Sequence, residues 1–376
     1  MDEGILQNQM KNIVIVTGCR PNIVKVAPMI RLLDGEKDFN TILIHSNQHY
    51  DPSMSQIFFD NLSVRQPDLT LSDISSNTEI QKIAEIMANF EDALKNLPSL
   101  PDLVLVVGDV NTTMACSFVA NRMGIKLGHI ESGLRSHNRM MPEEINRIMT
   151  DHLSDLLFVT EKDAIANLLK EGIPSEKIHF VGNIMIDSMI QEIEKTKEMG
   201  GAIDGDYCYV TLHRPSNVDD FERLKCIVEM LEWVSKRMLV IFSIHKRTHN
   251  NLKKFDLYGK LLKNNNIMIS EPLGYHENLN LVMNSKFVLT DSAGISEETS
   301  FLNVPCLTLR TETERPVTVQ LGTNIVENDI EKMKTNICAI LIGQKKQTKE
   351  IPKWDGKTAE RIIEILKNLL QKGEKK

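Results

Sequence analysis

The sequence predicts an α/β protein built from two doubly wound, Rossmann-like domains that face a cleft. Short, continuous apolar runs alternate with amphipathic helical patterns along most of the chain, which is typical of parallel strands covered by helices on both faces. This alternation starts again after a polar, glycine-bearing stretch at 192–206. A length of 376 residues is also too great for one ordinary core and suits two domains.

In the first half, the predicted strands are the apolar runs at 12–17, 41–45, 103–107, 126–130 and 156–160. Helical periodicity is clearest at 23–33 and 161–171. Each strand is followed by small or polar residues, as expected where parallel strands end and ligands bind.

In the second half, the predicted strands are 207–212, 238–244, 267–269, 287–290 and 305–309, with a strong amphipathic helix at 221–236. The last helix, 358–370, has an apolar stripe that must cover another surface. We therefore predict one domain over 1–190 that holds most of the catalytic carboxylates and a second over 191–356. The C-terminal helix, 357–376, is expected to pack back on the first domain.

Composition excludes several function classes. The net charge of −7 disfavours nonspecific binding of nucleic acid, and no apolar run approaches the ~18 residues of a membrane helix. Six scattered cysteines without a C-x-x-C pair predict buried free thiols and a reducing cytoplasm. The sequence has no Walker A motif, no G-x-G-x-x-G after its first strand and no zincin motif, so neither a nicotinamide cofactor nor a metal is indicated.

The stretch 291–298 predicts an anion site. It follows the apolar run 287–290, and Ser292, Ala293 and Gly294 then lead into a helix. Free backbone N–H groups and the positive end of a helix dipole bind phosphate at such a turn. Glu297 and Glu298 follow at once, and a carboxylate near a phosphate turn often accepts ribose hydroxyls. The pattern suggests a nucleoside diphosphate.

The first strand also ends in a ligand-binding pattern. Gly18 is expected to allow a tight turn, and Pro21 suits a first helical position. Arg20 and Lys25 would then face an anion at the strand end. The alternative is a solvated basic pair at the start of a helix.

Three carboxylates follow strands of the first half. Asp109 comes after the strand at 103–107, Glu131 after the strand at 126–130, and Glu143 opens the next helix. The alternatives are an N-cap role for Asp109 or Asn111 and a helix-dipole role for Glu143 and its neighbour. Carboxylates that cluster push their pKa values apart, which allows one to act as a base and another as an acid.

Two histidines occupy equivalent positions in the second half. His213 and Arg214 follow one strand, and His245 follows the next. A lone histidine is usually structural, but two with adjacent basic residues at successive strand ends favour a pocket for phosphate and hydroxyl groups.

Taken together, the motifs resemble the non-hydrolysing UDP-N-acetylglucosamine 2-epimerases, from about residue 11 to 329. The matching segments are Gly-Cys-Arg-Pro-Asn at 18–22, Gly-Asp at 108–109, His-Ile-Glu-Ser-Gly-Leu-Arg at 129–135, Pro-Glu-Glu-Ile-Asn-Arg at 142–147, His-Arg-Pro-Ser-Asn at 213–217, Asp-Ser-Ala-Gly-Ile-Ser-Glu-Glu at 291–298 and Thr-Glu-Arg-Pro at 313–316. The resemblance implies a GT-B type fold whose second domain binds UDP, and a cytoplasmic homodimer that needs no metal or nicotinamide and makes precursors of cell-surface polysaccharides.

The resemblance also implies the reaction and the roles of residues. UDP is eliminated from the sugar to leave 2-acetamidoglucal and adds back after a proton returns to the opposite face of C2. The implied catalytic residues are Asp109, Glu131, Glu143 and His213. The implied substrate-binding residues are Arg20, Lys25, His245, Ser292, Ala293, Gly294, Glu298 and Arg315.

Departures from the family pattern leave alternatives open. Ala293 and Ser296 stand where Gly and Gln are usual, and Ala293 would be strained if its position needs a positive φ. The Pro-Asn and His-Arg-Pro-Ser-Asn variants resemble a subgroup that acts on a modified UDP-sugar such as a diacetamido uronate. A hydrolysing epimerase, a GT-B glycosyltransferase and a catalytically dead nucleotide-sugar sensor are further alternatives.

Overall fold

The computed structural model describes residues 10–46, 59, 62, 64–198, 200, 203–344 and 346–371. The chain divides into two compact units. Unit 1 comprises Met1–Ser188 and Pro352–Lys376, and unit 2 comprises Met189–Ile351. Within the described residues, no helix is long and apolar enough to cross a membrane.

Unit 1 contains a seven-stranded sheet in the order β3-β2-β1-β4-β5-β6-β7, and every neighbouring pair is parallel. The strands are β1 (Lys11–Thr17), β2 (Phe39–His45), β3 (Leu69–Thr70), β4 (Leu103–Val107), β5 (Lys126–Ser132), β6 (Leu156–Val159) and β7 (Ile178–Phe180). The strand order reverses its direction of growth between β1 and β4, and the ends of parallel strands at such a switch point form a ligand site.

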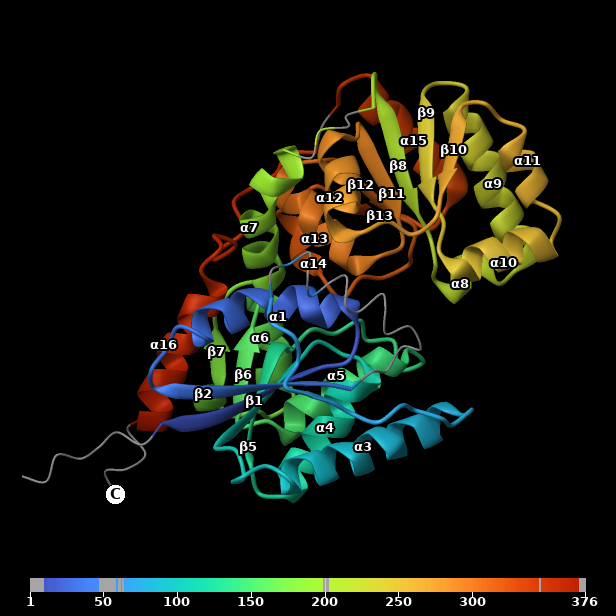
Figure 1. Cartoon of the computed structure of the whole chain (residues 1–376). Helices are drawn as coiled ribbons and strands as arrows, with labels where there is room; N and C mark the ends of the chain where they lie inside the picture. Colours follow the sequence, from blue (N-terminus) through green and yellow to red (C-terminus); the bar gives the residue numbers. More distant parts are fainter. Residues whose placement is uncertain are drawn as a thin grey trace, which may run out of the picture. The chain divides into compact units, whose positions relative to one another are not determined.

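Helices cover both faces of this sheet, with α3 and α4 on one face and α1 on the other (Figure 1). Apolar residues of β1, β4 and β5 form one core cluster with those of α3 and α4. The C-terminal helix α16 packs against α1 within unit 1. The helices are α1 (Arg20–Leu33), α3 (Glu79–Lys95), α4 (Asn111–Arg122), α5 (Pro142–Leu153), α6 (Lys162–Lys170), the 3-10 turn η1 (Ser175–Lys177), α7 (Ile184–Glu198), which continues into unit 2, and α16 (Thr358–Gln371).

Unit 2 contains a six-stranded parallel sheet in the order β10-β9-β8-β11-β12-β13. Its strands are β8 (Tyr207–Thr211), β9 (Leu239–Ser243), β10 (Ile267–Ser270), β11 (Phe287–Thr290), β12 (Cys306–Thr308) and β13 (Asn324–Val326). The two parallel sheets with their helices confirm the predicted α/β class and doubly wound architecture.

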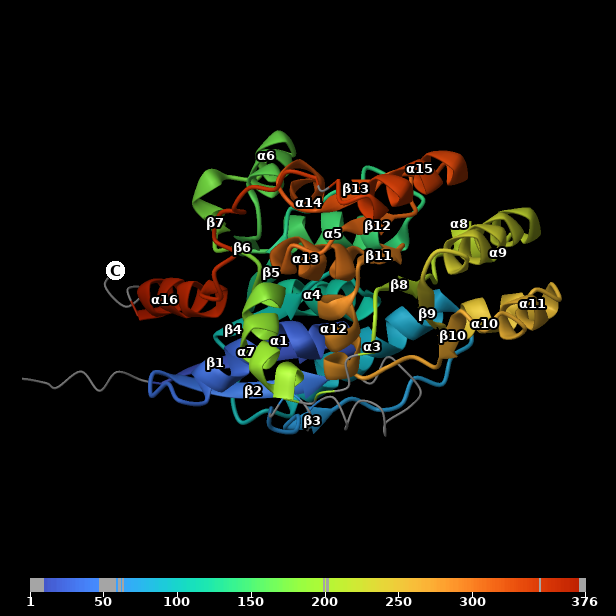
Figure 2. The same ribbon diagram turned by 90° about the horizontal axis from the view of Figure 1, so that it is seen from above.

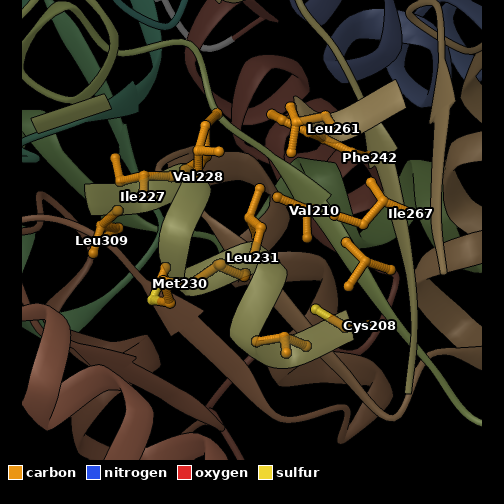
Figure 3. Packing of buried hydrophobic residues seen from close by; sticks show 14 of the residues in the cluster. Cys208, Val210, Ile227, Val228, Met230, Leu231, Phe242, Leu261, Ile267 and Leu309 are labelled. Carbon is orange, nitrogen blue, oxygen red and sulfur yellow. The ribbon is translucent and has the colours of Figure 1, made fainter. Parts of the chain in front are cut away.

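The helices of unit 2 are α8 (Pro215–Val218), α9 (Phe221–Ser235), α10 (Lys246–Lys254), α11 (Tyr258–Leu262), α12 (Tyr275–Asn284), α13 (Ala293–Leu302), α14 (Pro316–Gln320) and α15 (Ile330–Leu341). Strands β8 and β9 separate α9 from α12 (Figure 1, Figure 2). On the α9 side, Val228 and Leu231 pack with Val210 and Phe242 of the strands (Figure 3). This buried core holds the strand ends of unit 2 in place.

Two expectations about local structure were wrong. The predicted connection at 192–206 begins too early, because α7 continues to Glu198 and its residues Glu192 and Thr196 are buried. Gly18 does not have a positive φ, so it is not needed for a tight turn. A Cβ atom at this position would lie 2.4 Å from the Oγ1 atom of Thr112, and glycine is required there for close approach.

Candidate active site

The turn after β1 brings Lys25 to the carboxylate region of unit 1. Asn22 fixes this turn, because its Oδ1 atom accepts the N–H groups of Gly18 and Cys19 while its Nδ2 atom donates to the carbonyl of Val107. The amide of Asn22 thus joins the start of α1 to the end of β4. Arg20 is the first residue of α1, but its side chain lies outside the described part of the chain.

Asp109 follows β4, after Gly108 at a φ of 71°. Its Oδ2 atom accepts from Nε of Arg147 at 3.0 Å and lies 2.9 Å from a terminal nitrogen of the same guanidinium. The N-cap of α4 is Val110, without a capping side chain, so the N-cap alternative for Asp109 and Asn111 is wrong. Asp109 is instead oriented by a buried arginine and keeps about a third of its side chain exposed, 32%.

Glu131 lies at a β-bulge in β5. The register between β5 and β6 shifts between Ile130 and Ser132, and Glu131 has a φ of 74°. A left-handed conformation costs a residue with a side chain roughly 1–2 kcal/mol. The bulge turns the Glu131 carboxylate toward Lys25, whose Nζ atom lies 2.5 Å from Oε2. A side chain at Gly108 would meet both groups within 4.0 Å, so the turns that carry Asp109 and Glu131 are neighbours.

Glu143 and Glu144 lie in the first turn of α5, where both interact favourably with the helix dipole. Glu144 is buried and accepts the backbone N–H groups of Ser136 and His137, and it pairs with Arg147 at 2.6 Å. Glu143 is only half-buried. The less buried residue of the two is therefore the one that the sequence predicts to be catalytic.

In unit 2, Asp291 organises the turn that carries His213. This fully buried aspartate accepts the backbone N–H groups of His213 and Arg214 and the side-chain amide of Asn217. Its Oδ1 atom lies 3.1 Å from Nδ1 of His213, whose side chain is 36% exposed. Burial alone would raise the pKa of Asp291, but the His213 ring and the surrounding N–H groups lower it below its ordinary value.

The predicted phosphate turn joins β11 to α13. Ser292 is the N-cap of α13, and Ala293 is its first residue. Neither Ala293 nor Gly294 has a positive φ, so the strain anticipated for Ala293 does not arise. The first N–H groups of α13 have no partner within the helix, which is the property that makes a helix start an anion site.

The two carboxylates of α13 have different surroundings. Glu297 pairs with Arg315 at 2.7 Å, and both are buried. Glu298 is buried too, but its Oε2 atom has no hydrogen-bond partner among the residues that the structure describes. Burial raises the pKa of Glu298 to about 8, and the charge of Glu297 adds to this rise. Glu298 is therefore a buried carboxyl group that can accept hydrogen bonds from the hydroxyl groups of a ligand.

Comparison with known proteins places this arrangement in a family. The model of the family described as UDP-N-acetylglucosamine 2-epimerase matches residues 31–367. The chain belongs to the UDP-N-acetylglucosamine 2-epimerase family. This confirms the family predicted from the motifs.

Two curated relatives of this epimerase are similar over nearly their whole length. The UDP-N-acetylglucosamine 2-epimerase of Methanocaldococcus jannaschii is 43% identical over 364 residues, which cover 94% of this chain and 98% of the relative. The UDP-2,3-diacetamido-2,3-dideoxy-D-glucuronate 2-epimerase of Pseudomonas aeruginosa is 35% identical over 361 residues, 95% of this chain and 99% of the relative.

A solved structure has the same fold as this epimerase. It is the M. jannaschii UDP-GlcNAc 2-epimerase in complex with UDP-GlcNAc and UDP. The TM-score is 0.87 at 41% identity, and the match covers 96% of this chain and 100% of that one. Together with the two parallel sheets, this likeness confirms the predicted GT-B type fold.

The remaining basic residues of the epimerase have clear positions. His245 is the exposed N-cap of α10, and its ring centroid lies 5.6 Å from that of His213. Arg214 lies near Glu314, at 3.8 Å, and Glu314 also pairs with Arg310 at 2.9 Å. These strand ends of unit 2 therefore carry several cations, as the sequence predicts.

The residues that hold the site together are not evident from the strand-end motifs. Arg147 lies in a matched motif but has no predicted role, Glu144 is predicted only as an alternative helix-dipole residue, and Asp151 has no predicted role. The signal available was their spacing, since positions 144, 147 and 151 follow each other along one face of a helix. An arginine and two acids on a buried helix face indicate ion pairs within the protein.

Proposed function

We propose that this chain catalyses the reversible C2 epimerisation of UDP-N-acetylglucosamine to UDP-N-acetylmannosamine. The observation that carries the proposal is the pair of carboxylates at the ends of adjacent strands β4 and β5, each beside a cation of unit 1. Membership of the family and the names of its relatives support the same reaction. Within it, a carboxylate can take or return the C2 proton.

The reaction starts by elimination. A base removes the hydrogen at C2, the C–H electrons form a C1–C2 double bond, and the C1–O bond breaks with its electron pair going to UDP. The products held at the site are 2-acetamidoglucal and UDP. A proton then adds to the opposite face of C2, and a phosphate oxygen of UDP forms the bond to C1 again. No oxidant or reductant is needed, so every step is a proton transfer or the transfer of UDP.

In this proposal the carboxylates of unit 1 perform the proton transfers. Asp109, Glu131 and Glu143 are the candidates, and we assign the C2 proton to none of them individually. Arg147 orients Asp109, and Lys25 lies close enough to Glu131 to stabilise its charge or that of a diphosphate. The strained backbone at residue 131 is consistent with a functional position.

The groups of unit 2 are assigned to UDP. The start of α13, at Ser292, Ala293 and Gly294, would bind a phosphate, and Glu298 would accept the ribose hydroxyls. His213, oriented by Asp291, would stabilise the negative charge that develops on the diphosphate when the C1–O bond breaks. Further substrate contacts are assigned to Arg20, His245 and Arg315.

A second candidate substrate is a diacetamido uronate linked to UDP. The observation in its favour is the similarity to the P. aeruginosa enzyme together with the basic residues Arg214 and Arg310 in unit 2. A uronate carries an additional carboxylate, which an arginine binds in a bidentate manner. The same reaction would then occur at C2 of a different sugar.

Incubation with each UDP-sugar in deuterated water tests the proposal. Proton NMR should show deuterium at C2 and formation of UDP-N-acetylmannosamine from UDP-N-acetylglucosamine. Exchange only with the diacetamido uronate would support the second candidate. Free UDP as the main product would indicate hydrolysis, and product formation only with an added sugar acceptor would indicate a glycosyltransferase. Exchange with neither UDP-sugar would refute an epimerase.

We also infer, from the family, that the enzyme is a homodimer of the cytoplasm whose two domains divide near residues 190 and 356. Light scattering of the purified chain tests the assembly. A mass near twice the 42.7 kDa of one chain is expected. A single-chain mass at working concentration would contradict the dimer.

A further inference from the structure

A buried charged pair lies beneath the carboxylates of unit 1, and the proposed reaction gives it no role. His129 lies on β5, and Asp151 lies near the end of α5. Both side chains are completely buried. Nδ1 of His129 is 2.6 Å from Oδ1 of Asp151. Burying two ionisable groups together is costly unless each is fully paired, so their other contacts show what they do.

The contacts of His129 fix its protonation. Its Nε2 atom lies 2.8 Å from the carbonyl oxygen of Gly108, which can only accept a hydrogen bond. Its Nδ1 atom faces Asp151, whose second oxygen accepts from the N–H of Gly133 at 3.0 Å and lies 2.7 Å from the guanidinium of Arg135. An ionised carboxylate also only accepts. Both ring nitrogens therefore face acceptor atoms, and this arrangement is fully hydrogen-bonded only when each nitrogen carries a hydrogen.

Asp151 is ionised for a separate reason. Its burial would raise the pKa of the carboxyl, but the His129 ring and the guanidinium of Arg135 lower it below its ordinary value. Arg135 lies 2.7 Å from Asp151 and carries its charge whatever the state of the ring. The guanidinium of Arg135 also lies 2.7 Å from a carboxylate oxygen of the partly exposed Glu171. Arg135 therefore pairs with two carboxylates, the buried Asp151 and the partly exposed Glu171.

His129 holds the peptide that leads into Asp109. Its Nε2–H group binds the carbonyl of Gly108, and the N–H of Gly108 donates to the carbonyl of Ile130 at 3.1 Å. The two peptide groups on either side of the Gly108 α-carbon are thus both tied to β5, and the second of them leads into Asp109. The direction of the Asp109 side chain depends on the rotation of that peptide.

Asp151 holds the bulge that carries Glu131. One of its oxygens binds His129 before the bulge, and the other binds the N–H of Gly133 after it, where φ is 79°. Glu131, with its own positive φ, lies between these two anchors. One carboxylate therefore fixes both ends of a strained turn, which would otherwise relax toward an ordinary strand conformation.

We propose that His129, held as an imidazolium by Asp151, is a positioning residue that fixes Asp109 and Glu131 relative to each other for proton transfer at C2. The pair does not touch the substrate. The catalytic consequence rests on the proposed function, whereas the charged state of the ring does not. A displacement of about 1 Å in a reacting group can cost ~100-fold in rate, which gives the scale of the effect.

The test compares His129→Gln with His179→Gln. Glutamine offers N–H groups from a single nitrogen and cannot reach both partners of His129. His179 is on β7 of the same unit, its ring lies against Phe158, and its Nε2 atom has no hydrogen-bond partner among the described residues. C2 deuterium exchange by His129→Gln should fall about 100-fold in kcat with little change in KM, and His179→Gln should resemble the wild type.

The state of the ring is measured separately in the wild type. Nitrogen-15 NMR at pH 7.5 should show a proton on each ring nitrogen of His129, identified by its contacts with the backbone of Gly108. A ring with a single N–H would overturn the inference, even if His129→Gln fails to fold. A folded His129→Gln enzyme with wild-type kcat would overturn it as well. If the wild type shows no C2 exchange, the proposed function fails, and the NMR signal still decides the charged state.

Discussion

Both units place a completely buried aspartate behind their candidate catalytic turns, but the histidine that each aspartate contacts has a different environment. In unit 1, Asp151 contacts His129, whose side chain has no exposure. In unit 2, Asp291 contacts His213, whose side chain is 36% exposed. The first histidine has protein acceptors at both ring nitrogens, while the second presents part of its ring to the surroundings.

This difference indicates that a pair of a buried aspartate and a histidine serves a different purpose in each unit. Where both ring nitrogens are bound within the protein, the histidine can only fix the backbone. Where the aspartate holds one nitrogen and the ring remains exposed, the histidine can act on a ligand. We therefore assign proton transfer to the carboxylates around His129 and stabilisation of UDP to the groups around His213.

The largest effect is expected from a substitution that impairs proton transfer but not UDP binding. Asp109→Asn removes a carboxylate of unit 1 while its neighbours stay in place, so kcat for C2 exchange should fall by about 10³-fold. The affinity for UDP, measured by calorimetry, should stay near the wild-type value. Asp92→Asn, an exposed position on α3, is the matched control. A parallel loss of UDP affinity in Asp109→Asn would contradict the division between the units.

The pH dependence of stability should differ between the units because of Glu298. Its folded pKa of about 8 lies above the ordinary value of 4.5, so the folded chain keeps a proton that the unfolded chain releases. The wild type should therefore lose stability as pH rises from about 4.5 to about 8.

Glu298→Gln tests this dependence, because an amide does not titrate in that range. Between pH 5 and pH 8.5, at ~0.1 M salt, the melting temperature of the wild type should fall more than that of the variant. Equal slopes for the two proteins would show that Glu298 is ionised without cost in the folded state.

A smaller effect concerns the backbone of Glu131. The turn at Ser292–Ala293 in unit 2 has no positive φ, whereas Glu131 in unit 1 does. Both Glu131→Gly and Glu131→Ala remove the carboxylate, but only glycine adopts this conformation without strain. Glu131→Gly should be the more stable of the two by about 1 kcal/mol in urea unfolding. Equal stabilities would mean that the bulge relaxes once the carboxylate is gone.

The smallest effect is expected at Ala293. Since Ala293 begins α13 with an ordinary helical backbone, Ala293→Gly should reduce the free energy of unfolding by less than about 1 kcal/mol. UDP affinity, measured by calorimetry, should not change. A clear gain in affinity on substitution would show that the methyl group limits the approach of a phosphate.

The parts of the site that could be predicted from the sequence are those that depend only on neighbouring residues along the chain. Asp109 and His213 each follow an apolar strand, Glu131 lies near the end of another, and Ser292 precedes a helix directly after a fourth. Because the parallel strands of a sheet end at one edge, their order along the sequence is enough to predict a ligand-binding edge in each unit. Short-range pattern was thus sufficient for the strand-end residues.

The supporting contacts could not be predicted in this way. The partners Asp109 and Arg147, and likewise His213 and Asp291, lie far apart in the sequence, and single-sequence patterns do not encode such pairings. The bulge at Glu131 depends on a positive φ, which a glutamate in the sequence does not predict. Those features orient the candidate catalytic groups, and only the folded structure shows them.

The most direct test of the central claim follows the bond between C1 and the diphosphate. UDP-N-acetylglucosamine labelled with oxygen-18 in the C1–O–P bridge is incubated with the wild-type enzyme, and the label is located by phosphorus NMR. The account predicts that the label moves into the non-bridging positions of the β-phosphate while deuterium enters C2. Deuterium exchange with the label still in the bridge would show that UDP never leaves the sugar, and would contradict elimination.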